Sequence, residues 1–396
     1  MRELFITNIH IGKVRHLEDV DIALSDSERK HLILTGKNGS GKTSLLEAMG
    51  DAVLSEQYRK WLSLDRRERE QIARPDVERK FGASDIGISY SDAIEDFLSV
   101  FYVYIPAERH EMTQPKAIET VDIRGKSVIT RNASKDFLKY ILSLYVQYLS
   151  AKDSGASPGE VGRYSEWFDN FTQALREIYE CQELELKPDM KNLAFRIAMP
   201  GREPFGLHEM SDGYKAFLEI FMELILRFES ENAAGMVDYT RSAIVLIDEI
   251  ETHLHVELQK RALPFLTRMF PNVQFIVATH SPFVITSLSN AVVYDLEKRE
   301  RLENPTFYSY ESVVESFLDT SVYSAELQRY FSRYKELAFK RRTAEENEEF
   351  LRAKTELELM APAFKELYLA FTDAAFKRKI VRDDPALSEQ FAGALV

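Results

Sequence analysis

The sequence predicts an α/β fold with a mixed sheet, an inserted helical lobe and a helical C-terminal region. Three observations predict it: a glycine-rich loop between an apolar run and a helical pattern, a later strand–helix–strand pattern with apolar strands, and a mostly helical stretch between them. We therefore divide the chain into an α/β domain at 1–109 and 181–300, a lobe at 110–180 and a C-terminal region at 301–396.

The composition is that of an ordinary globular chain of 396 residues, of which 45% are hydrophobic and 29% charged. The single cysteine, Cys181, excludes an internal disulfide framework and a cysteine-built metal site. No apolar run approaches the roughly 20 residues that span a bilayer, and the N-terminus has a strand pattern rather than a secretion signal. We expect a cytoplasmic protein without a membrane partner. The net charge of −13 argues against nonspecific coating of nucleic acid but permits a local basic groove.

The chain opens with two expected strands, Phe5–Ile9 and Val20–Leu24, in which β-rich residues alternate. The apolar run Leu32–Leu34 follows, and after it comes GKNGSGKT at Gly36–Thr43, which matches G-x-x-x-x-G-K-[ST] without a mismatch. A helical pattern begins at Thr43. Strand, loop and helix in this order predict phosphate binding, because the glycines let backbone N–H groups turn toward a polyphosphate at a helix N-terminus.

The loop supplies the expected ATP-binding residues. Lys42 would reach the β- and γ-phosphates, and Thr43 would hold Mg²⁺. The full expected set is Gly36, Lys37, Asn38, Gly39, Ser40, Gly41, Lys42, Thr43 and Ser44.

The middle of the chain predicts the lobe and its return to the sheet. Strands are expected at Asp85–Tyr90 and Val100–Ile105, and SGASPGE at 154–160 divides the lobe into two helices. Further elements are expected in chain order as strands Leu184–Leu186 and Leu193–Ala198, helix Ser211–Phe228, strand Ser242–Ile247, helix Val256–Met269, strand Val273–Thr279 and strand Ala291–Leu296, which closes the sheet. From Tyr310 the pattern is helical and highly charged.

Two strand ends carry the chemistry that complements the loop. IVLIDE ends in Asp248, which suits a second Mg²⁺-organising role, and Glu249, which suits polarisation of the attacking water. THSPF follows the strand VQFIVA, so His280 could contact the γ-phosphate and sense its loss. A helix-capping or core histidine is the alternative. We predict Lys42, Glu249 and His280 as catalytic residues, with Thr43 and Asp248 as the Mg²⁺ ligands.

The segment DEIETHLH at 248–255 resembles the DEPExHLHP segment of overcoming-lysogenization-defect (OLD) and RecF-like ATPases of the ABC superfamily, although Ile250 and Val256 stand where proline is usual. The resemblance implies an ABC-type P-loop nucleotide-binding domain, and a stretch that crosses a dimer interface. His253 and His255 could instead hold zinc. However, no cysteine or spaced carboxylate cluster completes such a site.

HEMSDGYKAFLEI at 208–220 resembles the ABC signature L-S-x-G-[EQ], with Met210 and Tyr214 as departures. The resemblance implies that Ser211, Asp212 and Gly213 face the γ-phosphate bound by a second subunit. Ser211 is also a good helix N-cap. A Ser-His-Asp hydrolase site is disfavoured, because neighbours in sequence rarely make a triad and no nucleophile-elbow pattern is present.

YIPAER at 104–109 also resembles a segment of OLD-like ATPases. Arg109 could contact nucleotide or the lobe, or form a surface ion pair. Gln57 and Gln71 are candidates for the glutamine that links nucleotide to lobe motion in ABC proteins. The helical pattern beyond residue 300 lacks the acidic strand ends of a Toprim nuclease, so none is expected here.

The resemblance to the OLD, RecF and SMC-like group implies that ATP closes a homodimer or higher homo-oligomer and that hydrolysis reopens it. Because no effector domain is expected, we hypothesise control of a separately encoded nuclease or toxin in prokaryotic anti-phage defence. One alternative is a DNA-repair or DNA-end-binding ATPase, and DNA remains a possible partner. Another is a regulatory scaffold that holds ATP with little turnover. The trigger and the effector are not set by the sequence.

Overall fold

The computed structural model describes residues 4–63, 85–91, 101–109, 115, 117, 133–228, 237, 239–316, 318, 325–339 and 342–359. The chain divides into two compact units, Met1–Asp319 and Thr320–Val396. The first unit contains all the described strands and the helices up to α8.

A six-stranded mixed sheet forms the centre of the first unit, in the order β12-β11-β3-β10-β9-β5. Five of its strands are parallel and β12 is antiparallel. Their bounds are β3 at His31–Thr35, β5 at Phe101–Ile105, β9 at Ala243–Ile247, β10 at Val273–Ala278, β11 at Ala291–Asp295 and β12 at Glu300–Glu303. The predicted mixed α/β sheet is therefore confirmed.

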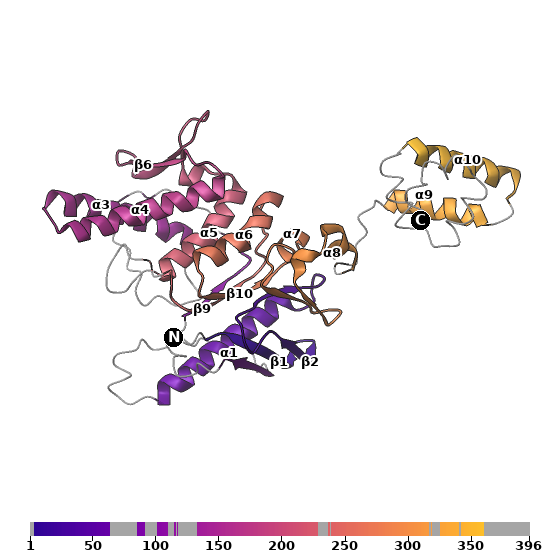
Figure 1. Ribbon diagram of the computed structural model, residues 1–396, viewed down its shortest axis with the longest axis horizontal. Coiled ribbons are helices and arrows are strands. Elements are labelled where there is room, and N and C mark those ends of the chain that lie inside the picture. The colour runs from indigo at the N-terminus through magenta and orange to yellow at the C-terminus, as the bar shows by residue number, and fades with distance from the viewer. Residues whose placement is uncertain are drawn as a thin grey trace. The chain divides into compact units, whose positions relative to one another are not determined.

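The sheet is covered on both faces, which explains its uninterrupted apolar strands. In β9, Ala243, Val245 and Ile247 join one hydrophobic cluster, whereas Ile244 and Leu246 join the other. Figure 1 shows β9 and β10 between the two covering layers. The layer on one face contains α3 (Ala133–Asp153), α4 (Pro158–Tyr179), α5 (Asp212–Phe228) and α6 (Val256–Met269). The layer on the other contains α1 (Lys42–Ser63), β1 (Ile6–Val14) and β2 (Leu17–Ala23).

Two smaller antiparallel sheets flank this centre. One has the order β2-β1-β4, with β4 at Asp85–Tyr90. The other has the order β6-β7-β8, with β6 at Glu185–Asp189, β7 at Ala194–Ala198 and β8 at Phe205–Gly206. The short strand β8 was not expected from sequence, because two residues give no alternation to detect.

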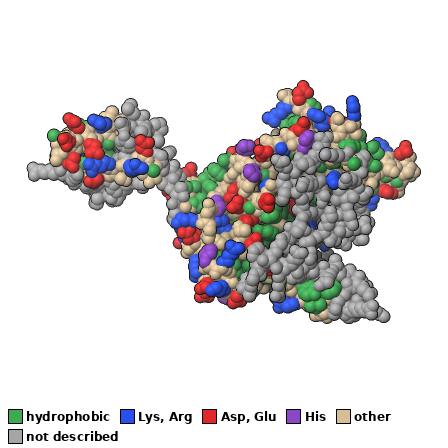
Figure 2. Space-filling model, turned by 180° about the vertical axis from the view of Figure 1, so that it is seen from behind, with side chains coloured by type: hydrophobic (Ala, Val, Ile, Leu, Met, Phe, Trp, Pro, Cys, Tyr) green, Lys and Arg blue, Asp and Glu red, His purple; other side chains and the backbone are tan. Residues whose placement is uncertain are grey.

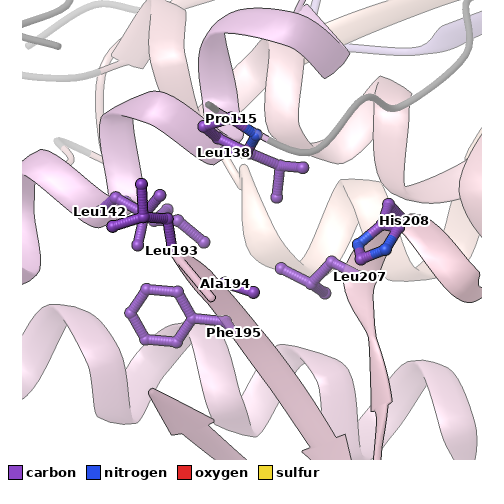
Figure 3. Close-up of a pocket in the computed structure, with 9 residues that line it drawn as sticks. Pro115, Leu138, Leu142, Leu193, Ala194, Phe195, Leu207 and His208 are labelled. Atoms are coloured by element: carbon purple, nitrogen blue, oxygen red, sulfur yellow. The ribbon is translucent and has the colours of Figure 1, made fainter. Parts of the chain in front are cut away.

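The lobe consists of two helices, as predicted from the glycine-proline break. α3 ends at Asp153, and α4 begins at Pro158 with Ser157 as its N-cap, whose hydroxyl accepts from Glu160 N. A small pocket lies between α3 and β7 (Figure 3). Among the described residues, its lining is apolar apart from the His208 ring.

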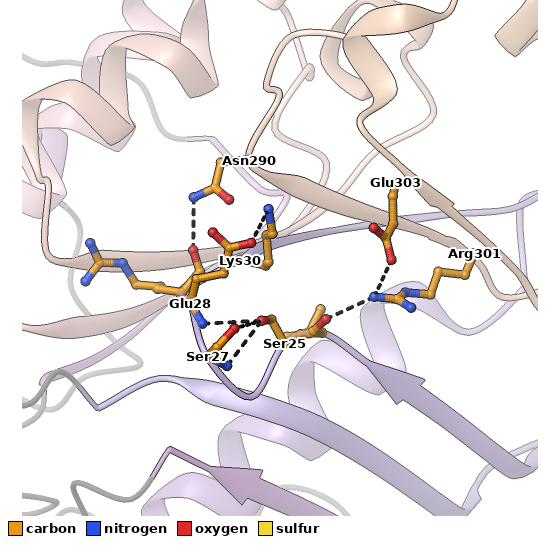
Figure 4. A network of polar contacts seen from close by, with 9 residues as sticks. Ser25, Ser27, Glu28, Lys30, Asn290, Arg301 and Glu303 are labelled. Carbon is orange, nitrogen blue, oxygen red and sulfur yellow. Dashed lines mark hydrogen bonds and ion pairs between the residues drawn. The ribbon is translucent and has the colours of Figure 1, made fainter.

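The prediction that Ala291–Leu296 closes the sheet was wrong, because β12 follows β11 and pairs with it. Its sequence ERLE has no apolar alternation and only Leu302 is buried. A long-range contact supports it instead: Arg301 donates to the Leu24 carbonyl at 3.0 Å, and within β12 the same side chain pairs with Glu303 at 2.9 Å (Figure 4). Hydroxyl contacts of Ser25 shape the adjoining turn after β2.

The remaining described α-helices are α7 at Pro282–Ile285 and α8 at Tyr310–Ser316 in the first unit, and α9 at Ala325–Phe339 and α10 at Ala344–Leu359 in the second. In the second unit, Tyr334 stacks on Phe350 with ring centroids 4.9 Å apart, and Arg333 pairs with Glu349. No helix within the described ranges is both long enough and apolar enough to cross a bilayer.

Candidate functional site

The predicted motifs meet at the carboxyl edge of the sheet because they follow neighbouring parallel strands. The glycine-lysine loop follows β3, His280 follows β10, Asp248 and Glu249 follow β9, and Arg109 lies just beyond β5. In the sheet these four strands are adjacent in that order. Ligands of open α/β sheets bind at this edge.

The loop adopts a conformation that needs its glycines. Gly36, Gly39 and Gly41 all have positive φ, at 131°, 84° and 98°. A side chain at Gly36 would approach Ser40 Oγ to 2.9 Å. α1 then begins at Lys42, so its N-terminus points its free N–H groups and positive dipole end at the loop.

Lys42 is buried and contacts the loop itself. Its Nζ donates to the Gly36 carbonyl at 2.8 Å and to the Lys37 carbonyl at 3.2 Å. Burial lowers the pKa of Lys42, and the carboxylates of Asp248, Glu249 and other neighbours act in the opposite direction. The ammonium is therefore held among carbonyl oxygens, where phosphate oxygens could replace them.

Asp248 directly follows β9 and contacts Thr43 at the start of α1. It accepts a hydrogen bond from Thr43, and burial raises the pKa of its carboxyl group. Among the residues described, Asp248 Oδ1 and Ser40 Oγ are buried and have no hydrogen-bond partner. Leaving such an atom unsatisfied costs about 1–3 kcal/mol. A carboxylate and hydroxyls are the donor set that Mg²⁺ accepts, so these residues fit a magnesium–phosphate ligand.

Glu249 occupies a turn with left-handed backbone, φ 43°. Its side chain is only partly buried, and Oε2 accepts from Thr252 Oγ1 at 3.2 Å. The main chain of this turn is anchored on two sides: Asp248 N donates to the Ile105 carbonyl, and Ile250 N to the Ala278 carbonyl. The main chain that carries the Glu249 carboxylate is therefore held in place. Among the described residues, the carboxylate itself has one hydrogen bond, from Thr252.

His280 is linked to the same turn through Glu251. The Glu251 carboxylate accepts from His280 N at 2.5 Å and from Thr279 Oγ1 at 2.7 Å. Burial, followed by the charge of Lys42, lowers the pKa of His280, so the imidazole is neutral near pH 7. Sequence analysis gave Glu251 no role. Its position two residues after Glu249 was visible, but its partner lies on another strand.

The start of α5 contains Ser211, Asp212 and Gly213. The described contacts of these residues are within α5 and with the turn at His253–His255, and not with the glycine-lysine loop. The Ser211 carbonyl accepts from Lys215 N, and Asp212 lies 3.8 Å from Lys215 Nζ. A side chain at Gly213 would lie 3.0 Å from the His253 carbonyl oxygen, so α5 packs closely on the turn at His253–His255. Ser211 and Asp212 are exposed.

The alternatives for the histidine pair and for Arg109 now have structural answers. Within the described ranges, no group of three or more His, Cys, Asp or Glu side chains could hold a metal ion, so His253 and His255 lack further ligands. The described hydrogen bonds of Arg109 are with neither nucleotide-loop nor lobe residues. Its Nη2 donates to the carbonyls of Asp248 and Glu249. Gln57 is buried in α1, and Gln71 lies outside the described residues.

A parallel-rich sheet with a glycine-lysine loop between β3 and α1 defines a P-loop ATPase domain. The family described as "AAA domain, putative AbiEii toxin, Type IV TA system" matches residues 32–286, more than half of the chain. The chain belongs to this family.

Curated relatives and a solved structure resemble parts of the chain. The chain is 30% identical over 141 residues to the retron Vc95 probable ATPase of Vibrio cholerae serotype O1 biovar El Tor, covering 33% of this chain and 27% of the relative. It is 22% identical over 316 residues to the Septu protein PtuA of Bacillus mycoides (strain KBAB4), covering 76% and 42%. The chain thus spans less than half the length of either. The SMC head domain from Thermotoga maritima aligns over 74% of this chain and 94% of its own, with 14% identity and a TM-score of 0.37.

Proposed function

We propose that this chain is a Mg²⁺-dependent ATPase whose ATP-driven dimerisation controls a separately encoded nuclease or toxin in anti-phage defence. The observation that carries the ATPase proposal is the convergence of Lys42, Asp248, Glu249 and His280 at one sheet edge beside two unsatisfied buried oxygens. The family description names a putative toxin of a type IV TA system, and relatives carry retron and Septu names; both support a defence role.

In this proposal Lys42 exchanges the Gly36 and Lys37 carbonyls for β- and γ-phosphate oxygens. Thr43 and Asp248 hold Mg²⁺, which neutralises charge on the phosphates. Glu249 polarises the attacking water and accepts its proton. Among the described residues, only Thr252 donates a hydrogen bond to this carboxylate, and it does so to Oε2. His280 contacts the γ-phosphate, and Glu251 fixes the main chain of the histidine.

The test measures the rate of ATP hydrolysis by the purified wild-type protein in the presence of Mg²⁺ and compares it with the rate of the Glu249→Gln variant. This substitution keeps shape but removes the proton acceptor, so kcat should fall about 10²- to 10⁴-fold while ATP affinity is retained. Glu257→Gln is the matched control, because Glu257 is an exposed carboxylate paired with Lys260. An unchanged rate in Glu249→Gln would support the scaffold alternative instead.

The effector part is tested separately by co-expression with the products of neighbouring genes. We expect a nuclease or toxin to bind this chain. The activity of that effector should differ when it is bound to the ATP-trapped Glu249→Gln form and when it is bound to the nucleotide-free form. An active ATPase that binds none of these products contradicts the effector proposal. In Figure 2, basic and acidic side chains are interspersed over the described part of the visible face. DNA-stimulated hydrolysis that falls steeply with salt would favour the DNA-binding alternative.

A further inference from the structure

We propose that Arg109 is a positioning residue: it holds the Asp248–Glu249 turn in place. The inference rests on the proposed ATPase function, because the turn carries the carboxylate that would activate water. Arg109 itself makes no contact with the loop in the described hydrogen bonds.

The guanidinium group bridges two strand ends. Nη2 donates to the Asp248 carbonyl at 3.3 Å and to the Glu249 carbonyl at 3.4 Å, and Nη1 donates to the Pro106 carbonyl. The main chains are also joined, since Asp248 N donates to the Ile105 carbonyl at 2.9 Å. Arg109 thus extends the β5–β9 pairing beyond the last ladder bond and into the turn.

This turn needs such support because its conformation is unfavourable. A left-handed backbone costs a non-glycine residue about 1–2 kcal/mol, and Glu249 adopts it at φ 43°. Strained conformations persist only when the surroundings determine them. A planar guanidinium presents several N–H groups in fixed directions and can contact two carbonyls at once, which a lysine ammonium does more loosely.

Charge connects Arg109 to the helix that begins beside Ser211. Burial lowers the pKa of Arg109, and among neighbouring charges Glu219 opposes this most strongly, ahead of Asp248 and Glu249. Glu219 is buried on α5. A buried cation is tolerated when a carboxylate accompanies it. Arg109 therefore has neighbouring charges both in the Asp248–Glu249 turn and, at Glu219, on the helix whose N-terminus would face the nucleotide of a second subunit.

Because Glu219 and the Asp248–Glu249 turn are both charge neighbours of Arg109, a displacement of α5 would act on the Glu249 carboxylate through Arg109. In a dimer with shared nucleotides, this coupling would join the two sites through one subunit. It involves contacts within a single chain, so its test does not depend on the effector.

The experiment compares Arg109→Gln, Arg109→Lys and Glu219→Gln with a matched control, Arg268→Gln, which removes an arginine from a surface ion pair with Glu177. Arg109→Gln should lower kcat at least tenfold while KM and the ATP affinity measured without turnover change less than about threefold. Arg109→Lys should recover part of kcat, because it restores the charge but not the paired donors. Arg268→Gln should match the wild type.

A double variant shows whether Arg109 and Glu219 act as one unit. If they do, the double variant should lower log kcat, and the unfolding temperature measured without nucleotide, by less than the sum of the decreases in Arg109→Gln and Glu219→Gln. Unchanged kcat in Arg109→Gln, a loss confined to ATP affinity, or additive effects would overturn the inference. If Arg109→Gln fails to fold, Arg109→Lys and Glu219→Gln carry the comparison. A wild type without turnover would instead refute the proposed function, and the unfolding temperatures would still test the coupling.

Discussion

At the scale of single residues, the site keeps charges partly out of water without pairing them directly. Lys42 lies on two carbonyl oxygens, while Asp248 has one oxygen without a described partner. Burial lowers the pKa of the first and raises the pKa of the second. Both shifts mean that the charged forms are less stable here than in water. A triphosphate with its metal would supply the missing counter-charges.

Replacement of Lys42 should therefore separate binding from folding. Lys42→Ala should weaken ATP binding at least tenfold, because the charged contact to phosphate is lost. The unfolding temperature without nucleotide should change little, because the variant also removes the cost of burying an ammonium. Fluorescent-nucleotide titration and thermal unfolding measure the two effects. Lys60→Ala, a lysine in the last turn of the same helix, is the control. A Lys42→Ala protein that binds ATP normally would contradict this role.

His31 predicts how stability depends on pH. It begins β3, is buried, and its Nδ1 accepts from Phe275 N at 3.0 Å, which requires that nitrogen to be unprotonated. Burial lowers its pKa from 6.5 to about 4. The unfolded chain therefore binds the proton more readily, so the stabilisation is present above the unfolded pKa and is lost as pH falls toward about 4. Between about pH 7 and pH 5 the free energy of unfolding should fall by about 2 kcal/mol from this group.

The measurement is denaturant unfolding across that pH range. His31→Asn keeps an acceptor for Phe275 N but does not titrate, so its stability should fall less on acidification than that of the wild type. His10→Asn is the opposite comparison, because the contact with Asp21 raises the pKa of this exposed histidine and so stabilises the folded protein as pH falls. The stability of His10→Asn should therefore fall at least as steeply on acidification as that of the wild type. Equal pH dependence in wild type and His31→Asn would rule out this assignment.

At the scale of elements, α1 illustrates why helix propensity alone misleads. Gly50 lies inside this helix, where alanine usually adds up to about 1 kcal/mol of stability. Here a Cβ would lie 2.2 Å from the Tyr102 hydroxyl oxygen of β5, whose side chain is buried. Gly50→Ala should therefore destabilise the protein by about 1–3 kcal/mol. Gly50→Ala with Tyr102→Phe should be less destabilised than Gly50→Ala, as measured by denaturant unfolding. A stabilised single variant would show that Tyr102 moves freely.

The elements also show which features a sequence can predict. Buried strands such as β9 and β10 were predictable, because a sheet covered on both faces selects uninterrupted apolar runs. The same logic placed the loop, Asp248, Glu249 and His280 at one edge. β12 was missed, because its pairing depends on contacts of Arg301 with a distant turn. The contacts of Arg109 and Glu251 were also missed, because they follow from the order β3-β10-β9-β5 and not from spacing along the chain.

One departure from the ABC signature has a packing explanation at this scale. Tyr214 stands where glutamate or glutamine is usual, and its ring stacks on Tyr179 with centroids 4.2 Å apart. Tyr179 ends α4, so the aromatic pair joins the lobe to the first turn of α5. Stacked aromatic pairs contribute about 0.5–1.5 kcal/mol beyond their buried area. The lobe is thus attached to the helix whose start would face a second subunit.

At the scale of the whole molecule, the proposed mechanism requires a second copy of the chain. The loop is at the carboxyl end of β3, whereas Ser211 and Gly213 lie beside the His253–His255 turn. Ser211 and Asp212 are exposed at the N-terminus of α5, where N–H groups and the helix dipole favour a phosphate. One chain therefore offers both halves of a phosphate site on different parts of its surface. Two chains can complete two sites.

Mixing two inactive variants tests this directly. Lys42→Ala removes the phosphate contact of the loop, and Ser211→Arg places a bulky cation at the start of α5, so each homodimer should have two defective sites. A mixed dimer contains one site with both defects and one site with neither, because loop and helix start come from different chains. Equal mixing should therefore restore up to about a quarter of wild-type turnover, since half of the dimers are mixed and each has one intact site. Steady-state hydrolysis at several protein concentrations measures this recovery. The control is Lys42→Ala mixed with Glu249→Gln. Both of these defects lie in the same half-site, so each mixed dimer is left without an intact site. Failure of the first mixture to recover turnover, or hydrolysis by a strict monomer, would contradict the shared site.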